Sequence, residues 1–387
     1  MQFYKTSRMS FLFGVVTVCS VVGFVPHIPQ KFTYVLLIVF ALYNFWKPHK
    51  TSRWLLFFLL YIPTELLISQ PDPLFKPWPR YAMFVLLLMC VSPLFQGEYH
   101  RNSRHHLMQM LLWSSVFLGV GSFFCWFLGI NYMRIRNIDF INNVGMFGGL
   151  TPHSMLLGPI SGIGAIFLSY LAMSSRKKWV WLLVILCLFS VMFSSSRIAL
   201  AASLAGIAVT FYKLSGSFDK FFRISVITLL LAGSTLSFWG RAMDGMMKKN
   251  SDAISTIDMS SRSDKWGMRI EEFKSSPMFG IGFSSVDKVK AVEEYDASTG
   301  IIEPGTSWLT IFSMLGLAGA VIILPFFYRC YKILWHQTDA YHATILGILT
   351  LLYVHMLAEG YVLSGGSFMC FVLWLTVGVA YDSRNPS

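Results

Sequence analysis

The run from Trp179 to Tyr212 is the feature that most constrains what this chain can fold into. It is almost wholly apolar, and Arg197 is its only charged residue. Because a bilayer core about 30 Å thick is crossed by about 20 helical residues, the run is too long for one membrane span. Three serines, Ser194–Ser196, directly precede the arginine. A break at these serines would divide the run into two short helices and place Arg197 at a membrane face or in a cavity.

Apolar segments of similar length recur along the whole chain. Hydrophobic residues make up 55% of the sequence and charged residues 13%, whereas a soluble protein has roughly 25% charged residues. We therefore expect an all-α polytopic membrane protein with about 12 transmembrane helices. The expected spans are 10–25, 32–46, 54–69, 80–95, 107–130, 154–174, 179–194, 197–213, 222–240, 305–328, 341–360 and 364–381. The first apolar run ends at Pro26 without a small-residue cleavage site, so it is predicted to be a retained span.

The basic residues of the short loops set the expected orientation. Most of them fall in loops that share one side with the N-terminus, and such a bias marks the cytoplasmic side. Both termini are thus predicted to be cytoplasmic. The expected division is 1–240 with nine spans, a long periplasmic loop at 241–304, and 305–387 with three spans and a cytoplasmic tail. The same bias accounts for the net charge of +12, so we expect no nucleic-acid partner.

The long loop contains the sequence SDKWGMRIEEFK. Its residues Trp266, Ile270 and Phe273 have the spacing of one apolar stripe on an amphipathic helix. The charged residues expected to turn away from this stripe are Glu271, Glu272 and Lys274. Ser261 or Ser263 is a possible N-cap, and Pro277 is expected to end the helix. The pattern favours a helix lying on the outer membrane surface.

Arg197 is the first candidate for a functional residue. An arginine near membrane depth usually faces a cavity and has a partner, and its planar guanidinium suits phosphate oxygens. The adjacent Ser196 favours a polar pocket, although an arginine that snorkels to the interface is the alternative. Arg262, just before the expected surface helix, is either a second anion contact at a helix N-terminus or a solvated loop residue. Arg269, on that helix, completes this part of the expected substrate-binding set.

Arg134 and Arg136 form another basic cluster in the expected outer loops. They belong to RIRNIDFINNVGMFGGLTPHSM, which is rich in asparagine and glycine. This segment either lines a sugar site or is an ordinary loop. His153, at the head of the sixth span, is a candidate base or sugar contact, with a structural role as the alternative.

Two acidic residues are further candidates. Glu303 precedes the tenth span at its outer end. Glu359 follows His355 by four residues, and on one helix this spacing puts both on the same face. A carboxylate within a membrane is a functional candidate by default, while a buried structural pair is the alternative for His355 and Glu359.

Several signals for cofactor chemistry are absent from the sequence. There is no Walker A motif, no G-x-S-x-G and no H-E-x-x-H. The six cysteines form no C-x-x-C pair, so neither a disulfide framework nor a zinc site is predicted. We expect no cofactor and no metal, and the energy for any reaction would come from the substrate.

Three stretches together resemble the bacterial O-antigen polymerase and ligase family, of the Wzy and WaaL type. SSSRIALAASLAG is similar to the family's S-R signature at the start of a membrane helix. RSDKWGMRIEEFKSSPMFGIGF resembles its R-x-x-x-W…P-x-x-G-x-G-F element, and EPGTSWLTIFSMLGLAGA resembles the segment that follows. The resemblance covers about 190–320.

The resemblance implies a metal-independent glycosyltransferase of the bacterial inner membrane. Its donors would be undecaprenyl-pyrophosphate-linked glycans, used on the periplasmic face. Arg197 and Arg262 fall on the family's two arginines, which the resemblance assigns to the pyrophosphate. Glu303 and His153 are the candidates for the catalytic base. A flippase and a chain-length regulator of the same pathway are the implied partners.

One departure from the family pattern favours the polymerase. Ligases typically carry a histidine in an H-N-x-x-x-L context after the loop, whereas Thr306 and Ser307 stand here. The O-antigen ligase, with lipid A–core as acceptor, remains the alternative. A lipid-linked oligosaccharide flippase should show related halves, which this sequence does not show. A purely structural membrane subunit would leave the outer arginines unexplained.

Overall fold

The structure, a computed structural model, describes residues 7–26, 28–133, 147–175, 177–216, 258–287, 295–296, 301–302 and 305–384. These residues are mostly helical. The helices are α1 (Arg8–Cys19), α2 (Gln30–Phe45), α3 (Arg53–Ser69), the 3₁₀ helix η1 (Pro73–Phe75), α4 (Pro77–Val91), α5 (Glu98–Phe127), α6 (Ser154–Ser175), α7 (Lys178–Phe193), α8 (Arg197–Ser215), α11 (Asp258–Ser275), α12 (Ser307–His336), α13 (Ala340–His355) and α14 (Phe368–Asp382). Two short antiparallel pairs join β1 (Lys50–Thr51) to β2 (Phe95–Gln96) and β3 (Tyr295–Asp296) to β4 (Ile301–Ile302).

The helical class of the fold is as predicted. A helix occupies each expected span that falls within the described ranges, and the expected span 222–240 lies outside them. Among the described residues, five helices are long and apolar enough to cross a membrane, and five more apolar helices are shorter. Many of the helices expose large apolar side chains, such as Phe57, Phe117 and Val321. A bundle surrounded by lipid tolerates such exposure because lipid tails are as apolar as a protein core. The exact number of twelve spans stays a prediction.

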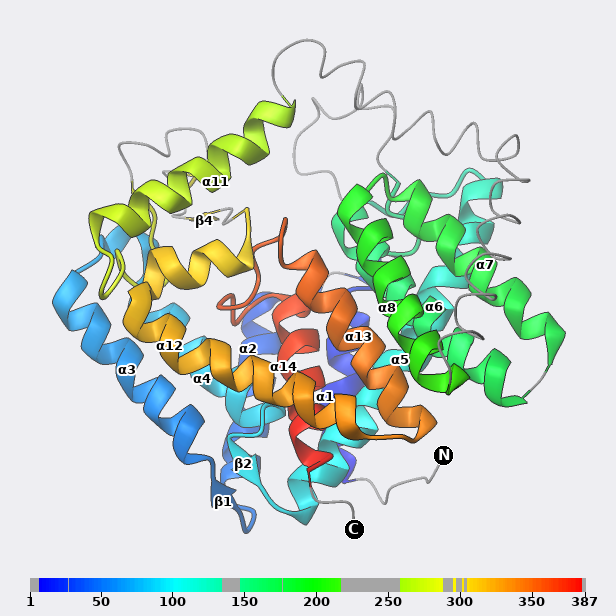
Figure 1. Cartoon of the computed structure of the whole chain (residues 1–387), viewed down its shortest axis with the longest axis horizontal. Helices are drawn as coiled ribbons and strands as arrows, with labels where there is room; N and C mark the ends of the chain where they lie inside the picture. The colour runs from blue at the N-terminus through cyan, green and yellow to red at the C-terminus, as the bar shows by residue number, and fades with distance from the viewer. Residues whose placement is uncertain are drawn as a thin grey trace.

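Helix α14 lies at the centre of the bundle, with α6, α7 and α8 on one side and α3 and α4 on the other, while α12 crosses it (Figure 1). Nearly all of α14 is buried, including Trp374. Helices α8 and α13 approach each other at Gly206 and Gly347. A Cβ atom at either glycine would lie 2.6–2.7 Å from the carbonyl oxygen of the other. Small residues that permit such backbone contact are a common means of packing helices in membranes.

Contacts between distant segments separate the bundle into two ends. At one end Ser10 Oγ lies 2.9 Å from Ser103 Oγ, and Lys213 Nζ donates to the Trp335 carbonyl over 2.6 Å. All four residues lie in or next to loops that were expected on the cytoplasmic side. At the other end the Gly23 amide donates to the Leu150 carbonyl, near loops that were expected outside. These contacts agree with the expected placement of the loops that they join, while the alternation of all twelve spans and the side of the membrane that each end faces stay predictions.

Helix α11 differs from the prediction at its start. It begins at Asp258, so Arg262 lies within the helix rather than before it, and neither Ser261 nor Ser263 is the N-cap. No proline or glycine stands between Asp258 and Arg262 to stop the helix there. The helix ends at Ser275, before Pro277, as predicted.

The face of α11 that is buried against the protein includes Glu272 and lies away from Trp266 and Ile270. Glu272, expected to turn away from the apolar stripe, is 1% exposed, whereas Trp266 and Ile270 of that stripe are 42% and 41% exposed. Burial of Glu272 is possible because its carboxylate pairs with Arg269 inside the protein, which compensates for the loss of contact with water. Phe273 is half-buried and packs edge-on against Phe312 of α12.

Candidate functional site

The break between α7 and α8 lies at the three serines, as predicted. Ser194 donates its hydroxyl to the Val191 carbonyl over 2.6 Å, and Ser195 adopts a φ of +56°, a left-handed conformation that stops a helix. Ser196 is the N-cap of α8, and its hydroxyl accepts from the Ala199 amide. Ser194 and Ser195 are buried, while Arg197, the first residue of α8, is exposed. The guanidinium therefore lies at the N-terminal end of a helix, where the dipole favours anions.

The head of α6 packs close to this break. A Cβ atom at Gly158 would lie 2.9 Å from Ser194 Oγ and 2.7 Å from Ala199 Cβ. The backbone of α6 therefore packs directly against the break between α7 and α8. His153, just before α6, is exposed, and its Nδ1 accepts from the Met155 amide over 3.1 Å. Because Nδ1 is the acceptor, a neutral ring holds its proton on Nε2. His153 in this conformation can donate a hydrogen bond at Nε2 but has no free lone pair for a proton.

A buried ion pair within α11 also bonds to the following loop and to α12. Arg269 Nη1 lies 2.7 Å from Glu272 Oε2, and both side chains are 0% exposed. The same Nη1 is 3.4 Å from the Ser285 carbonyl and 3.4 Å from Ser313 Oγ of α12. Glu272 Oε1 accepts from the Asp287 amide. The structure places Arg269, predicted to bind substrate, in the interior, where it joins α11 to the following loop and to α12.

The P-x-x-G-x-G-F segment, residues 277–283, pairs through its backbone with a kink in α12. The kink is at Gly316, with φ +64° and ψ −170°. The amides of Leu317 and Ala318 donate to the carbonyls of Pro277 and Met278. In return, the amide of Ile281 donates to the carbonyl of Ser313 over 2.9 Å.

Glycine is required where these two backbones meet. Gly280 has a φ of +81°, and a Cβ there would lie 2.4 Å from backbone atoms of Met314. A Cβ at Gly316 would lie equally close to backbone atoms of Met278. The glycines of the motif therefore hold the loop, and with it α11, against α12.

Glu65 on α3 is a site residue that the sequence analysis missed. Its side chain is 0% exposed, and Oε2 accepts from the Phe283 amide over 3.0 Å. Its other oxygen, Oε1, is buried and has no hydrogen-bond partner among the residues that the structure describes. Glu65 is the only acidic residue in the expected span 54–69, so the rule that singles out carboxylates in a membrane would have found it.

The start of α12 is joined to the end of α13 by Ser307. Its hydroxyl donates to the Glu359 carbonyl over 2.7 Å and accepts from the Tyr361 amide over 2.9 Å. Its own amide lies 3.0 Å from the carbonyls of Met356 and Glu359. Thr306 and Ser307 are 2% and 0% exposed, so these side chains are part of the scaffold.

These bonds overturn one prediction about α13. The helix ends at His355, so Glu359 lies in the following loop and does not share a helical face with His355. The carbonyls beyond His355 accept from Thr306 and Ser307 instead of continuing the helix. His355 is buried, and its Nδ1 lies 3.4 Å from the Tyr361 hydroxyl, whereas Glu359 is half-buried.

The register between α8 and α13 brings several candidates to one end of the bundle. The two helices are antiparallel, with Gly206 opposite Gly347 and the Thr210 hydroxyl donating to the Ala343 carbonyl. Continued toward the start of α8, this register puts Arg197 level with the end of α13. Arg197, Ser196, His355, Glu359 and the start of α12 therefore gather at the same end as the head of α6.

Four predicted site residues lie wholly or partly outside the described part of the chain. Arg134, Arg136 and Glu303 lie outside the described residues, and Arg262 is described only in its backbone, within α11. In the part of the chain that the structure describes, no three His, Cys, Asp or Glu side chains lie close enough together to hold a metal ion.

Comparison with known proteins identifies the segment that carries this site. Residues 182–324 match the family model described as O-antigen ligase. No curated protein matches the chain. The match spans most of α7, all of α8 and α11, and α12 as far as Leu324. It therefore includes the break at Ser194–Ser196, Arg197 and the segment 277–283. The resemblance to the O-antigen polymerase and ligase family is thereby confirmed, but the match does not distinguish a polymerase from a ligase.

Proposed function

We propose that this chain is a membrane glycosyltransferase that polymerises undecaprenyl-pyrophosphate-linked repeat units on the periplasmic face of a bacterial inner membrane. The observation that carries the proposal is Arg197, exposed at the N-terminus of α8 and inside the segment that matches the family. An exposed guanidinium beside helical N–H groups is suited to stabilise charge on a leaving pyrophosphate.

In the proposed reaction a hydroxyl of the acceptor's terminal sugar attacks the anomeric carbon of the donor glycan. The new glycosidic C–O bond forms as the bond to the pyrophosphate oxygen breaks, and the electron pair leaves with the pyrophosphate. Arg197 and Arg262 bind that anion, and a base accepts the hydroxyl proton. Because His153 Nδ1 already accepts from Met155, Glu303 is the better candidate for this base, and His153 is suited to donate to a sugar oxygen.

The nature of positions 306 and 307 supports a polymerase over a ligase. Ligases of the family are expected to have a histidine after the loop, but Thr306 and Ser307 are buried and hydrogen-bonded to the end of α13. No side chain at these two positions is available to act as a base. Arg134 and Arg136 would then serve the second lipid-linked glycan that a polymerase must hold. A chain-length regulator and a flippase of the same pathway are the proposed partners.

A reconstituted assay with a synthetic lipid-linked repeat unit tests the transferase. Arg197→Ala should reduce chain growth by at least about 100-fold, as expected for loss of a group that stabilises developing charge. Arg197→Lys should restore little, because an ammonium does not reproduce the bidentate fork. Arg53→Ala, an exposed arginine at the start of α3, is the control. Normal chain growth in the Arg197→Ala protein would refute the proposed role of Arg197.

A deletion strain separates the polymerase from the ligase. Without a polymerase, surface glycan should be reduced to a single repeat unit. Without a ligase, long chains should instead accumulate on the undecaprenyl pyrophosphate carrier. The second result would replace the polymerase by the ligase and leave the role of Arg197 unchanged.

A further inference from the structure

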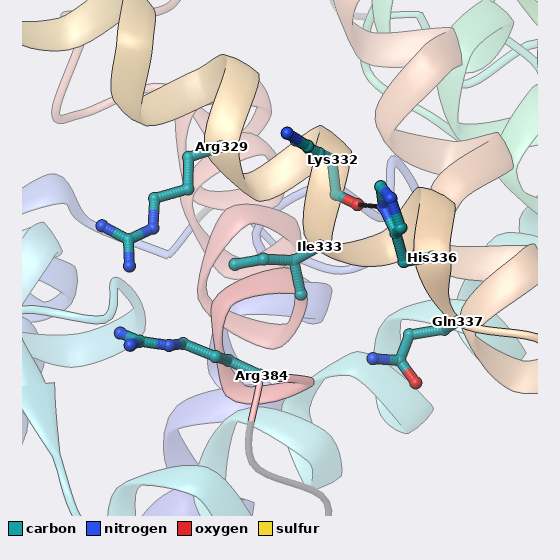
Figure 2. A pocket seen from close by; sticks show the side chains of 6 residues that line it. All are labelled: Arg329, Lys332, Ile333, His336, Gln337 and Arg384. Carbon is teal, nitrogen blue, oxygen red and sulfur yellow. Dashed lines mark hydrogen bonds between the residues drawn. The ribbon is translucent and has the colours of Figure 1, made fainter.

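A basic pocket lies at the end of the bundle opposite the candidate site, where α12 and α14 end. Its volume is about 470 Å³, within the range of small-molecule sites. The residues that line it are Arg329, Lys332, Ile333, His336, Gln337 and Arg384. In Figure 2 the guanidinium groups of Arg329 and Arg384 extend toward the same side of this pocket. The Gln337 amide donates to the Ser383 carbonyl over 3.1 Å, which joins the ends of the two helices that form the walls.

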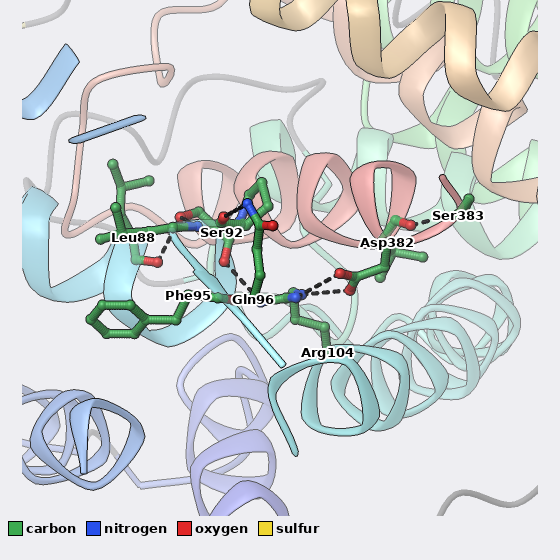
Figure 3. A network of polar contacts seen from close by, with 10 residues as sticks. Leu88, Ser92, Phe95, Gln96, Arg104, Asp382 and Ser383 are labelled. Atoms are coloured by element: carbon green, nitrogen blue, oxygen red, sulfur yellow. Dashed lines mark hydrogen bonds and ion pairs between the residues drawn. The ribbon is translucent and has the colours of Figure 1, made fainter. Parts of the chain in front are cut away.

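The pocket holds positive charge that no carboxylate neutralises. Among the residues that the structure describes, Arg329, Lys332 and Arg384 form no ion pair. The nearby acid in the sequence, Asp382, is engaged elsewhere: its two oxygens accept from Nε and Nη2 of Arg104, each over 2.7 Å (Figure 3). The positive-inside bias accounts for basic residues at this end of the molecule, but it does not require them to converge around one hollow.

The depth of the pocket matches the level of lipid head groups. Tyr328 and Trp335, on the same stretch of α12, are 66% and 39% exposed. Exposed tyrosine and tryptophan side chains near helix ends are typical of the membrane–water interface. Ile333 and the alkyl stems of the basic residues supply an apolar wall, while the guanidinium groups supply donors in a planar fork. Basic pockets between helices on the cytoplasmic side are suited to phosphate-bearing head groups.

We propose that this pocket binds a phosphate group, held by Arg329, Arg384 and Lys332. The binding site is separate from the transferase site, so it stands or fails independently of the proposed function. Two sources offer the same chemistry: the head group of an anionic phospholipid in the adjacent leaflet, and a soluble phosphate compound.

Binding to the detergent-solubilised full chain tests the proposal with three probes. The probes are short-chain phosphatidylglycerol, short-chain phosphatidylcholine and inorganic phosphate, each titrated at fixed ionic strength. We expect the double variant Arg329→Gln/Arg384→Gln to bind the preferred phosphate probe about 30-fold more weakly, since each basic residue near an anionic head group contributes about fivefold in affinity. The matched control is Lys177→Gln/Lys178→Gln, which removes two exposed charges outside the pocket. Lys332 is also exposed, so Lys332→Gln tests the pocket without disturbing the helix ends.

Each outcome decides the question. Preference for phosphatidylglycerol over phosphatidylcholine and inorganic phosphate, with loss in the pocket variants alone, identifies a lipid head-group site. Equally tight binding of inorganic phosphate with the same loss identifies a soluble phosphate ligand. If the pocket variants bind both anionic probes as the wild type and the control do, the proposal is wrong.

Discussion

Two buried arginine–carboxylate pairs, at opposite ends of the molecule, do different things. Arg104 and Asp382 lie far apart in the sequence, and the pair joins the start of α5 to the end of α14 (Figure 3). Arg104 Nη1 also donates to the carbonyls of Ser92 and Phe95, over 2.9 and 3.0 Å. Arg269 and Glu272 are three residues apart on α11. The first pair joins two helices of the bundle. The second lies within one helix, and its side chains bond to the following loop and to α12.

The two pairs differ in which parts of the structure must assemble before their buried charges are hydrogen-bonded. The carbonyls that accept from Arg104 belong to Ser92 and Phe95, just before α5, whereas Asp382 is at the far end of the sequence, so the pair forms only when α5 and α14 pack together. The partners of Arg269 are close in sequence or belong to α12, so the pair is satisfied when α11 docks. Removing one partner of a buried pair leaves an uncompensated charge, which costs about 3–5 kcal/mol. Loss of the first pair should therefore destabilise the whole bundle, whereas loss of the second should detach mainly α11.

The largest effect is expected from Arg104→Ala. It leaves Asp382 buried and removes donors from two carbonyls, so we expect about 3–5 kcal/mol of lost stability and a lower yield of folded protein. Unfolding of the purified protein in detergent, followed by tryptophan fluorescence, measures the change. Arg53→Ala, at an exposed position at the start of α3, serves as control. Equal stability of the two variants would show that the pair does not join α5 to α14.

Arg269→Ala should act locally. We expect α11 to detach, so that a protease cleaves within 258–287 while global unfolding changes less than in Arg104→Ala. Chain growth should also fall, because α11 carries Arg262. The double variant Arg269→Ala/Glu272→Ala removes the uncompensated carboxylate as well and should be less sensitive to the protease than Arg269→Ala. Greater sensitivity of the double variant would contradict this account, and Lys274→Ala, at an exposed position of α11, is the control.

Glu65 sharpens the comparison because it holds the same loop from α3. Glu65→Ala leaves the buried Phe283 amide without its acceptor, and we expect a loss of about 1–3 kcal/mol. Glu65→Gln retains a carbonyl oxygen at this position and should behave nearly as the wild type in stability. Unfolding measurements on both variants decide between an acceptor that positions the loop and a carboxylate whose charge matters; a severe loss in Glu65→Gln would favour the latter.

The smallest changes in stability are expected from alanine substitutions at two glycines, Gly280 and Gly267. Gly280→Ala forces a Cβ against the backbone of Met314 at a positive φ, so we expect a loss of about 1–3 kcal/mol. Gly267→Ala, in the middle of α11 with open space around it, should stabilise the protein by about 0.5–1 kcal/mol. Thermal unfolding of the two variants should shift in opposite directions, and unchanged or raised stability of Gly280→Ala would show that loop 277–283 does not need its glycine.

The sequence by itself determined the features that depend on neighbours along the chain. The apolar segments predicted the helices, because each such segment must satisfy its own backbone hydrogen bonds. The serines at 194–196 predicted the break before Arg197, since their hydroxyls bond to adjacent backbone groups. Pro277 predicted the end of α11, and the motifs around these positions predicted the family.

Only the tertiary structure decided which faces and ends of the helices meet. Glu272 turned inward because Arg269 and the Asp287 amide meet it there, and Glu359 left α13 because Ser307 binds the carbonyls beyond His355. Glu65 gained its role from an amide far away in the sequence. In a membrane protein the lipid is as apolar as the core, so an apolar pattern marks a helix but carries little information about which of its faces contacts the protein.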